Sequence, residues 1–239
     1  MIPILVETPR FVVLDKPAGL AVHPGPAGGP SVEDCFPALS RRKDGPWLVH
    51  RLDAGTAGCL VVALRKQALV RAQAAFAAGS VRKTYWAIVH GVPRATQGEV
   101  RDHLRKRTSP AGWRMEAGSE GQIARTAWRV MGQSAGMAWL ELHPSTGRTH
   151  QVRVHCAGLG HPILGDAIYG REDGGRGDGP LHLLARAIAL PLDPPLSAMA
   201  PPPAHMRDAL LACGWDGSTD QEPPAEQQRL RPCLPHQAR

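Results

Sequence analysis

Apolar and polar positions along the chain predict many strands and few helices. Residues 58–64, GCLVVAL, form a continuous apolar run of strand length, which is typical of a strand covered on both faces. Residues 83–91, KTYWAIVHG, alternate, so that a face with Tyr85 is opposite a face with Trp86. Further strand candidates with alternating large residues are 124–131, ARTAWRVM, and 136–144, GMAWLELHP.

Two helices are predicted between these strands. Residues 66–79, KQALVRAQAAFAAG, are rich in alanine, carry apolar residues at helical spacing and end at Gly79. A second helix is predicted to start from a Thr149 cap and to end at Gly158 or Gly160. Because strands often follow one another and helices are irregularly interspersed, we predict an α+β fold with a mixed, mostly antiparallel sheet.

Several segments lack apolar periodicity and are predicted to be irregular. Residues 25–31 and 101–114 are expected to be loops, and residues 170–180 a disordered connection. From Pro191 the composition shifts to Pro-rich and polar residues, which bury little apolar area. We therefore expect one folded domain over residues 1–192. Residues 193–239 should be an extended or disordered tail with a short helix around 205–213.

Composition places the chain among globular proteins. Hydrophobic residues make up 43% of its 239 residues, which is enough to build a core. No apolar stretch approaches the roughly 18 residues needed to cross a bilayer. The start, MIPILVETPR, lacks the basic flank, apolar region and cleavage site of a signal peptide. We expect a cytoplasmic protein without a membrane partner, and a monomer.

Cysteine and histidine spacing argues against a metal site. The five cysteines never form a CxxC pair, so neither a disulfide framework nor a zinc knuckle is indicated, and free thiols are expected. No HExxH spacing is present, so we expect structural hydrogen bonding rather than metal binding at the histidines that invite such a reading. These histidines are His50, His150, His155 and His161.

A basic charge balance favours a polyanionic partner. Lys and Arg number 28 against 21 Asp and Glu, which gives a formal charge of +7 and an isoelectric point near 9.6. Within residues 101–114 the basic residues Arg101, Arg105, Lys106, Arg107 and Arg114 face Asp102 alone. From charge alone, this segment is equally well a solvated loop or an arm that binds phosphates.

Asp53 is the first candidate for chemistry. It follows Arg51 closely and precedes the predicted buried strand at 58–64, a setting that can hold a carboxylate rigidly and partly desolvate it. From local sequence alone, a turn-capping role before Ala54 and Gly55 is the more common use of such an aspartate. The choice between these two roles needs information from other segments.

The second candidate region is residues 140–170, LELHPSTGRTHQVRVHCAGLGHPILGDAIYG. Arg148 and Arg153 lie around the first turns of its predicted helix, where backbone N–H groups already favour an anion. That anion can be a phosphate or a carboxylate of the protein. Asp166, in the loop after Pro162, is expected to be structural, and a glycosidase would need a second carboxylate near Asp53.

Several segments resemble the RluA family of RNA pseudouridine synthases. The three signature-like segments are HRLDAGTAG (50–58), KTYWAIVHG (83–91) and TGRTHQVRVHCAGLGHPILGDAIYG (146–170). The segments LDKPAGLAVHPG (14–25) and LHLLARAIALP (181–191) are similar to the family's first strand pair and closing strand. The resemblance covers roughly residues 2–192 in one order, which is far more specific than a lone motif.

The resemblance implies a pseudouridine synthase fold, with a bifurcated sheet flanked by helices and loops and an RNA-binding cleft across its middle. It implies isomerisation of uridine in ribosomal or transfer RNA without a cofactor. The N1–C1′ bond breaks, the uracil turns, and a C5–C1′ bond replaces it. A basic S4 domain, which some members carry, is not expected here because the first strand pair begins almost at Met1.

By resemblance, Asp53 is the catalytic aspartate and Arg153 the arginine that pairs with it. Attack on the sugar, attack on the base and assistance to the departing base are all left open. Tyr85 matches the tyrosine that stacks on the flipped uracil and takes part in moving the C5 proton. Val152 matches the aliphatic residue beside it, and Arg51 the side chain that enters the vacated space. Further RNA contacts are expected from Arg148, Arg101, Arg105, Lys106 and Arg107.

One departure from the family pattern lies beside Asp53. The chain has Thr56-Ala57-Gly58 where the family usually has Thr-Ser-Gly, which removes a hydroxyl near the active-site turn. The lost hydrogen bond is worth about 1 kcal/mol and belongs to no catalytic group. The alternative function is a catalytically idle RNA-binding protein or RNA chaperone on the same fold. Retention of Asp53, Tyr85 and Arg153 together argues against it.

Overall fold

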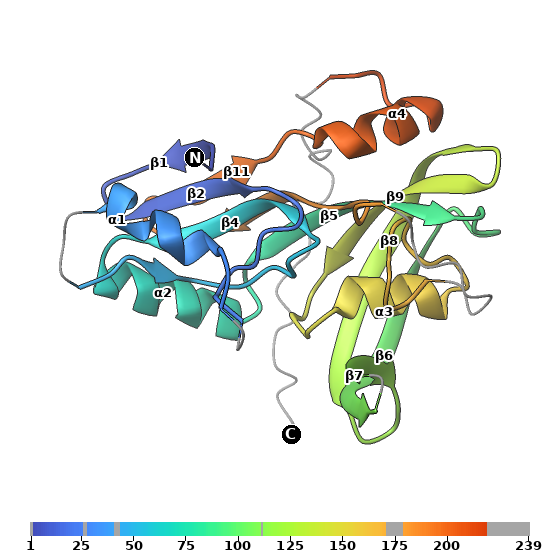
Figure 1. Cartoon of the computed structure of the whole chain (residues 1–239), viewed down its shortest axis with the longest axis horizontal. Coiled ribbons are helices and arrows are strands. Elements are labelled where there is room, and N and C mark those ends of the chain that lie inside the picture. Colours follow the sequence, from blue (N-terminus) through green and yellow to red (C-terminus); the bar gives the residue numbers. More distant parts are fainter. Residues whose placement is uncertain (1, 26–27, 41–43, 111, 171–178, 219–239) are drawn as a thin grey trace, which may run out of the picture.

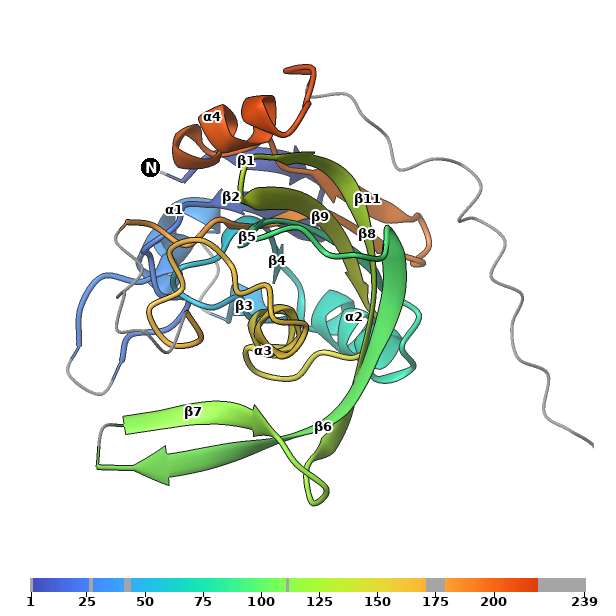
Figure 2. The same cartoon turned by 90° about the vertical axis from the view of Figure 1, so that its right-hand side faces the viewer.

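The protein is built on one strongly curved 11-stranded sheet with helices on both of its faces (Figures 1 and 2). A computed structural model describes residues 2–25, 28–40, 44–110, 112–170 and 179–218. The strands are β1 (Ile4–Glu7), β2 (Phe11–Lys16), β3 (Trp47–Leu48), β4 (Ala57–Ala63), β5 (Arg82–His90), β6 (Gln97–Ser109), β7 (Gly112–Ala117), β8 (Gln122–Ser134), β9 (Met137–Pro144), β10 (Leu183–Leu190) and β11 (Leu196–Met199). The helices are η1 (Val32–Cys35, a 3₁₀ helix), α1 (Phe36–Leu39), α2 (Lys66–Ala77), α3 (Gln151–Gly158) and α4 (Ala204–Ala212).

The strand order confirms the mixed, mostly antiparallel sheet. It runs β1-β2-β4-β10-β5-β9-β8-β6-β7, with β3 paired to β4 and β11 to β10. The ladder between β4 and β10 is parallel, and the other ladders between the described strands are antiparallel. The sheet therefore brings β4, β10 and β5, which are far apart in the sequence, side by side at its centre.

Strand β4 is the predicted apolar run, and all seven of its residues are buried. It lies between β2 and β10, so both of its edges are hydrogen-bonded. Gly58 has a φ of +104°, and a Cβ at this position would collide with the carbonyl oxygen of Ala185 on β10. A glycine is therefore required where the chain passes from the loop of Asp53 into the central strand.

The alternation predicted for β5 separates two layers of core. Trp86 packs with Met206 of α4 in one hydrophobic cluster, whereas Ala87 packs with Val152 of α3 in another. Figure 2 shows α4 above the sheet and α3 below it, within the curve of β8 and β9. Tyr85 belongs to the α3 side, so β5 presents it toward the helix that carries Arg153.

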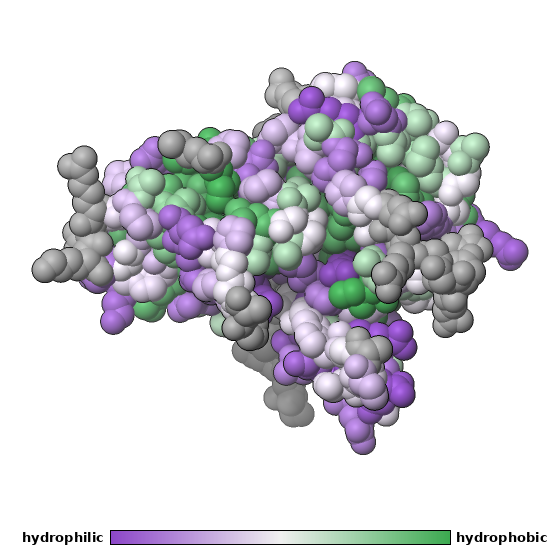
Figure 3. Space-filling view, in the orientation of Figure 1, coloured by the Kyte–Doolittle hydropathy of each residue, from purple (hydrophilic) through white to green (hydrophobic). Residues whose placement is uncertain are grey.

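The segment at 101–114, which the sequence analysis interpreted as a loop, is instead a hairpin. Strands β6 and β7 pair from Leu104–Ala117 to Ser109–Gly112, and β6 continues on β8. Its side chains are mostly exposed on both faces, so the alternation that marks a half-buried strand is missing. Only near its base does the hairpin reach the core, where Leu104 packs with Val154 of α3. The hairpin extends beneath α3 (Figure 2) and is largely hydrophilic (Figure 3).

Part of the predicted tail packs into the fold. Strand β11 pairs with β10, and α4 buries Met206 and Leu210 in the main core, where Trp215 is also buried. The predicted short helix is α4, but residues 193–218 belong to the packed unit, which differs from the predicted boundary at residue 192. The few apolar residues of this segment are enough to hold it in place, because each packs against a sheet that the preceding residues already form. Residues 219–239, and most of the predicted connection at 170–180, lie outside the described residues.

The start of α3 also differs from the prediction. The residue before the helix is His150, not Thr149, and its backbone is left-handed with a φ of 53°. No side chain caps this end. Among the described residues, no helix is long and apolar enough to cross a bilayer.

Candidate active site

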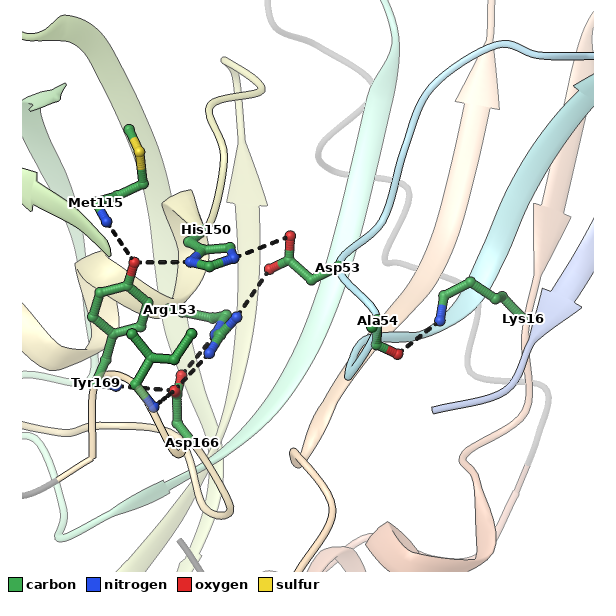
Figure 4. Close-up of polar contacts among 9 residues, drawn as sticks. Lys16, Asp53, Ala54, Met115, His150, Arg153, Asp166 and Tyr169 are labelled. Carbon is green, nitrogen blue, oxygen red and sulfur yellow. Dashed lines mark hydrogen bonds and ion pairs between the residues drawn. The ribbon is translucent and has the colours of Figure 1, made fainter. Parts of the chain in front are cut away.

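A buried lysine supports the loop between β3 and β4 that carries Asp53, on the side away from the carboxylate. Lys16, at the end of β2, donates to the carbonyl oxygens of Pro17 (2.8 Å), Leu20 (2.7 Å) and Ala54 (2.9 Å). Burial lowers the pKa of Lys16 to about 8, although the charge of Asp53 works in the opposite direction. Figure 4 shows Lys16 on the side of the loop away from the Asp53 carboxylate. The lysine therefore fixes the turn that aims this carboxylate.

Arg153 of α3 faces two carboxylates (Figure 4). Its Nη1 donates to Asp53 Oδ2 at 3.3 Å. Its Nε and Nη2 donate to the two oxygens of Asp166 at 2.8 and 2.7 Å, which is the geometry of a strong bidentate pair. The sequence analysis paired Arg153 with Asp53 and did not find this second, closer partner.

Asp166 is saturated with donors. Its side chain is 0% exposed, and Oδ1 also accepts the backbone N–H groups of Ile168 and Tyr169, each at 3.0 Å. Burial alone would raise the pKa of Asp166, but Arg153 and these backbone groups outweigh it and hold the pKa below 3.8. Asp166 is therefore a buried anion that orients Arg153, in keeping with the structural role expected for it.

Asp53 is more open than Asp166. Its side chain is 17% exposed, and besides Arg153 its near neighbour is His150, whose Nε2 lies 3.7 Å from Oδ1. This distance is too long for a hydrogen bond. Asp53 thus keeps lone pairs available on the side of the cavity that it lines.

A cavity of about 190 Å³ lies in front of Asp53. Six residues that the sequence analysis selected line it together, although they come from segments as far apart as residues 51 and 153. They are Arg51, Asp53, Tyr85, Arg148, Val152 and Arg153. Arg51 is exposed, Val152 is buried, and Arg148 uses its Nε to donate to the carbonyl oxygen of Ile123 at 3.1 Å.

Strand β5 contributes Lys83 to the lining of the cavity as well as Tyr85. Burial, with a contribution from Asp53, raises the pKa of Tyr85, so its phenol is protonated at neutral pH. Burial lowers the pKa of Lys83 to about 8, and its ammonium donates to the carbonyl oxygen of Thr146 at 2.8 Å. The cavity therefore offers one free carboxylate among several donors.

The hairpin arginines lie away from this cavity and partly neutralise local acids. Arg101 pairs with Glu99 at 2.7 Å, and Arg105 and Arg107 pair with Glu116 at 3.0 and 3.2 Å. The sequence analysis counted only Asp102 against this basic segment, because both glutamates fall just outside residues 101–114. Lys106 instead lies over the ring of Trp113, 4.9 Å from its centroid.

His50 makes a partly buried hydrogen bond beside the cavity. Burial, followed by the charge of Lys83, lowers the pKa of His50 to about 4, and its Nε2 accepts the N–H of Val61 at 3.1 Å. In the part of the chain that the structure describes, no three His, Cys, Asp or Glu side chains are grouped so as to hold a metal ion. The described cysteines, Cys35, Cys59, Cys156 and Cys213, are free thiols.

The sequence analysis missed the residues that join the hairpin to the site. Tyr169 accepts the N–H of Met115 on β7 at 2.9 Å and contacts His150 Nδ1 at 2.8 Å. Trp113 of β7 stacks on the ring of His150. Nothing local marks these residues, because each contact joins positions from separate elements.

Comparisons with known proteins identify the family and the fold. A family described as RNA pseudouridylate synthase matches residues 10–158. An uncharacterised RNA pseudouridine synthase of Zymomonas mobilis is 40% identical over 215 residues, covering 86% of this chain and 98% of the relative. The ribosomal large subunit pseudouridine synthase C of Buchnera aphidicola is 31% identical over 175 residues, covering 71% of this chain and 54% of the relative. The solved structure of human RNA pseudouridylate synthase domain containing 4 has a TM-score of 0.75 at 30% identity, covering 88% of this chain and 92% of that one.

Proposed function

The chain belongs to the RNA pseudouridylate synthase family, whose members are isomerases, and from this premise we propose that Asp53 is its catalytic carboxylate. The substrate is a uridine in RNA, and the product is pseudouridine. The glycosidic N1–C1′ bond breaks, the uracil turns within the cavity, and C5 joins C1′. C5 loses its proton to solvent as it bonds to C1′, and N1 takes up a proton after its bond to C1′ has broken, so product and substrate have the same atoms.

The observation that carries the proposal is the shared cavity of Asp53, Tyr85 and Arg153. Arg153 has one edge bound to buried Asp166, so its Nη1 is held toward Asp53 Oδ2. A carboxylate kept anionic and rigid by a fixed cation is suited to nucleophilic or electrostatic catalysis. A turn-capping aspartate has no need of such a partner.

Tyr85 acts as a neutral phenol in this proposal. Because burial raises its pKa, a phenolate is not available at neutral pH to remove the C5 proton as a base. Its ring stacks on the uracil, and its hydroxyl donates a hydrogen bond or relays a proton. Val152 packs against the apolar surface of the uracil that Tyr85 does not cover.

Base flipping follows from the depth of the site. Asp53 is 17% exposed in its side chain, so a stacked uridine must leave its stack to reach it, at a cost of a few kcal/mol. Exposed Arg51 lines the same cavity and enters the space that the base vacates. Arg148 and the basic residues of the β6–β7 hairpin bind the RNA backbone.

We propose ribosomal or transfer RNA as the substrate and a monomer in the cytoplasm as the acting form. The name of the Buchnera relative, ribosomal large subunit pseudouridine synthase C, supports ribosomal RNA. Mapping pseudouridines in the RNA of a deletion strain identifies the target. Loss of a site in transfer RNA alone would remove the ribosomal assignment.

The test of the function is release of tritium from RNA labelled at uridine C5. The wild-type protein should release tritium and form pseudouridine, and Asp53→Ala should do neither while still binding the RNA. Asp208→Ala, an exposed aspartate on α4, is the matched control and should keep full activity. Absence of release by the wild type would leave the idle RNA-binding protein as the better account, and equal release by Asp53→Ala and an active wild type would remove Asp53 from the reaction.

A further inference from the structure

His150 has an unusual backbone at the entrance to α3. It is the one non-glycine residue with a positive φ among the described residues, at φ 53° and ψ 15°. Its carbonyl oxygen accepts the first helical bond, from Val154 N at 2.9 Å, but its side chain makes no capping bond. Residues other than glycine adopt this conformation uncommonly, although histidine does so more often than most, and such strain persists where surrounding contacts enforce it.

Three contacts enforce the orientation of the His150 ring (Figure 4). Trp113 stacks on it with 5.1 Å between ring centroids and 24° between planes. Tyr169 meets it edge-on and places its hydroxyl 2.8 Å from Nδ1. The remaining nitrogen, Nε2, lies 3.7 Å from Asp53 Oδ1. The ring thus stands between the hairpin and the carboxylate.

The hydrogen bonds of Tyr169 favour one tautomer of this ring. The Tyr169 oxygen accepts the N–H of Met115, so its own hydrogen is free to be donated to His150 Nδ1. Burial lowers the pKa of His150, and the charge of Arg153 adds to this, whereas Asp53 opposes it. A neutral ring that accepts at Nδ1 carries its hydrogen on Nε2, which faces Asp53.

The two donors around Asp53 then address different oxygens. Arg153 Nη1 is 3.3 Å from Oδ2, and His150 Nε2 is 3.7 Å from Oδ1. Catalytic hydrogen bonds are often long before substrate binds and shorten in the complex. A small movement of the ring closes the second contact, and the carboxylate then has both oxygens fixed.

We propose that His150 is a positioning residue that links the β6–β7 hairpin to the orientation of Asp53. Trp113 and Met115 are two positions apart on β7, so one short stretch of the strand supplies both the ring that stacks on His150 and the backbone N–H that orients Tyr169. The same hairpin carries the basic residues proposed to bind RNA. Contact of the hairpin with RNA is thereby coupled to alignment of the Asp53 carboxylate. This inference rests on the proposed catalytic role of Asp53.

A first test needs no RNA. Nitrogen-15 NMR of the imidazole rings reports which nitrogen carries the hydrogen, and the His150→Gln variant identifies the His150 signal among the 11 histidines. We expect the Nε2–H tautomer at pH 7.5 in the wild type. Tyr169→Phe should lose this preference, because Nδ1 no longer accepts a hydrogen bond. An Nδ1–H tautomer or a protonated ring in the wild type would overturn the proposal.

The second test separates the catalytic step from RNA binding. Single-turnover tritium release from C5-labelled ribosomal and transfer RNA transcripts should slow about 10- to 100-fold in His150→Phe, which keeps the stacking but has no N–H. The half-saturating RNA concentration should change by less than about threefold. His150→Gln, whose amide can donate from near the Nε2 position, should recover most of the rate. His161→Gln, at a histidine bonded to the His90 carbonyl, is the control and should match the wild type.

A double-mutant cycle tests the link to the hairpin. Trp113→Ala should slow the catalytic step in the wild-type background and have little further effect in His150→Phe, since both changes act through one ring. Additive effects, or a His150→Gln variant as slow as His150→Phe, would overturn the link. If Asp53→Ala is inactive but the His150 variants, checked as folded by thermal unfolding, are fully active, only this inference fails. If Asp53→Ala is active, the proposed function fails.

Discussion

The loop that carries Asp166 and the loop that carries Asp53 approach the same guanidinium but differ in their hydrogen bonding. Asp166 is buried, receives two bonds from Arg153 and accepts two backbone N–H groups. Asp53 is partly open and receives one longer bond. Two carboxylates of the same residue type thus serve as an anchor and, in the proposed function, as the reactive group. What distinguishes them is how many of their lone pairs the protein has already used.

The largest stability effect should come from removing the charge of the anchor. Asp166→Asn leaves Arg153 buried against a neutral amide, and breaking a buried pair in this way costs about 3 to 5 kcal/mol of unfolding free energy. Urea unfolding measures this cost. Tritium release should also fall, because Arg153 is no longer held toward Asp53. A variant with wild-type stability would show that the two loops do not differ as described.

A smaller loss of stability is expected when the lysine that supports the Asp53 loop is replaced. Lys16→Met leaves three carbonyl oxygens without the ammonium that they share, and the unfolding free energy should fall by about 2 to 3 kcal/mol. Activity should fall further than stability explains, because the freed Ala54 carbonyl follows Asp53 directly. Lys66→Met, on the exposed start of α2, is the control and should change neither quantity.

Acid titration sharpens the comparison. Since the folded-state pKa of Asp166 lies below 3.8, its contribution to stability is present above pH 3.8 and is lost as the pH falls through the folded value. Urea unfolding between pH 2 and 6 should therefore show a weaker pH dependence in Asp166→Asn than in the wild type. Asp208→Asn should keep the wild-type dependence. Equal slopes in all three proteins would contradict the assignment of Asp166 as the anchor.

The smallest effect concerns the hairpin, where acids oppose the basic residues. Glu116→Gln frees Arg107 from its ion pair and leaves Arg105 with only its longer pair to Glu120 at 3.5 Å, so affinity for RNA should rise about two- to fivefold. This gain in affinity should shrink as the salt concentration is raised from 50 to 300 mM, by about the factor expected for two added phosphate contacts. Filter binding measures it. A loss of affinity would show that the two ion pairs shape the hairpin rather than mask its charge.

The spacing of apolar residues predicted the central strands and α2, because each of these elements is buried on one face or on both. The apolar run of β4, the alternation of β5 and the amphipathic α2 all follow from their own residues. The β6–β7 hairpin and β11 were not predicted. In the hairpin both faces meet solvent, and β11 obtains its stability from its pairing with β10.

The candidate site was predictable only where several segments agreed. Asp53, Tyr85 and Arg153 come from separate segments that resemble one family, and they line one cavity. Asp166 and Tyr169 sit in a glycine-containing loop whose local sequence indicates only a turn. Their partners, Arg153 and Met115, are fixed by the packing of α3 and β7, which no spacing in the sequence reveals.

The most direct measurement of the central claim uses Asp53→Asn, which keeps the shape of the side chain and removes its charge. Single-turnover tritium release from C5-labelled RNA and the free energy of unfolding are measured on the same preparation. The account predicts a rate lower by on the order of 10⁴-fold with unfolding free energy unchanged or raised, because Asp53 acts on substrate and is not needed for folding. A rate within tenfold of the wild type, or a loss matched by unfolding, would contradict it.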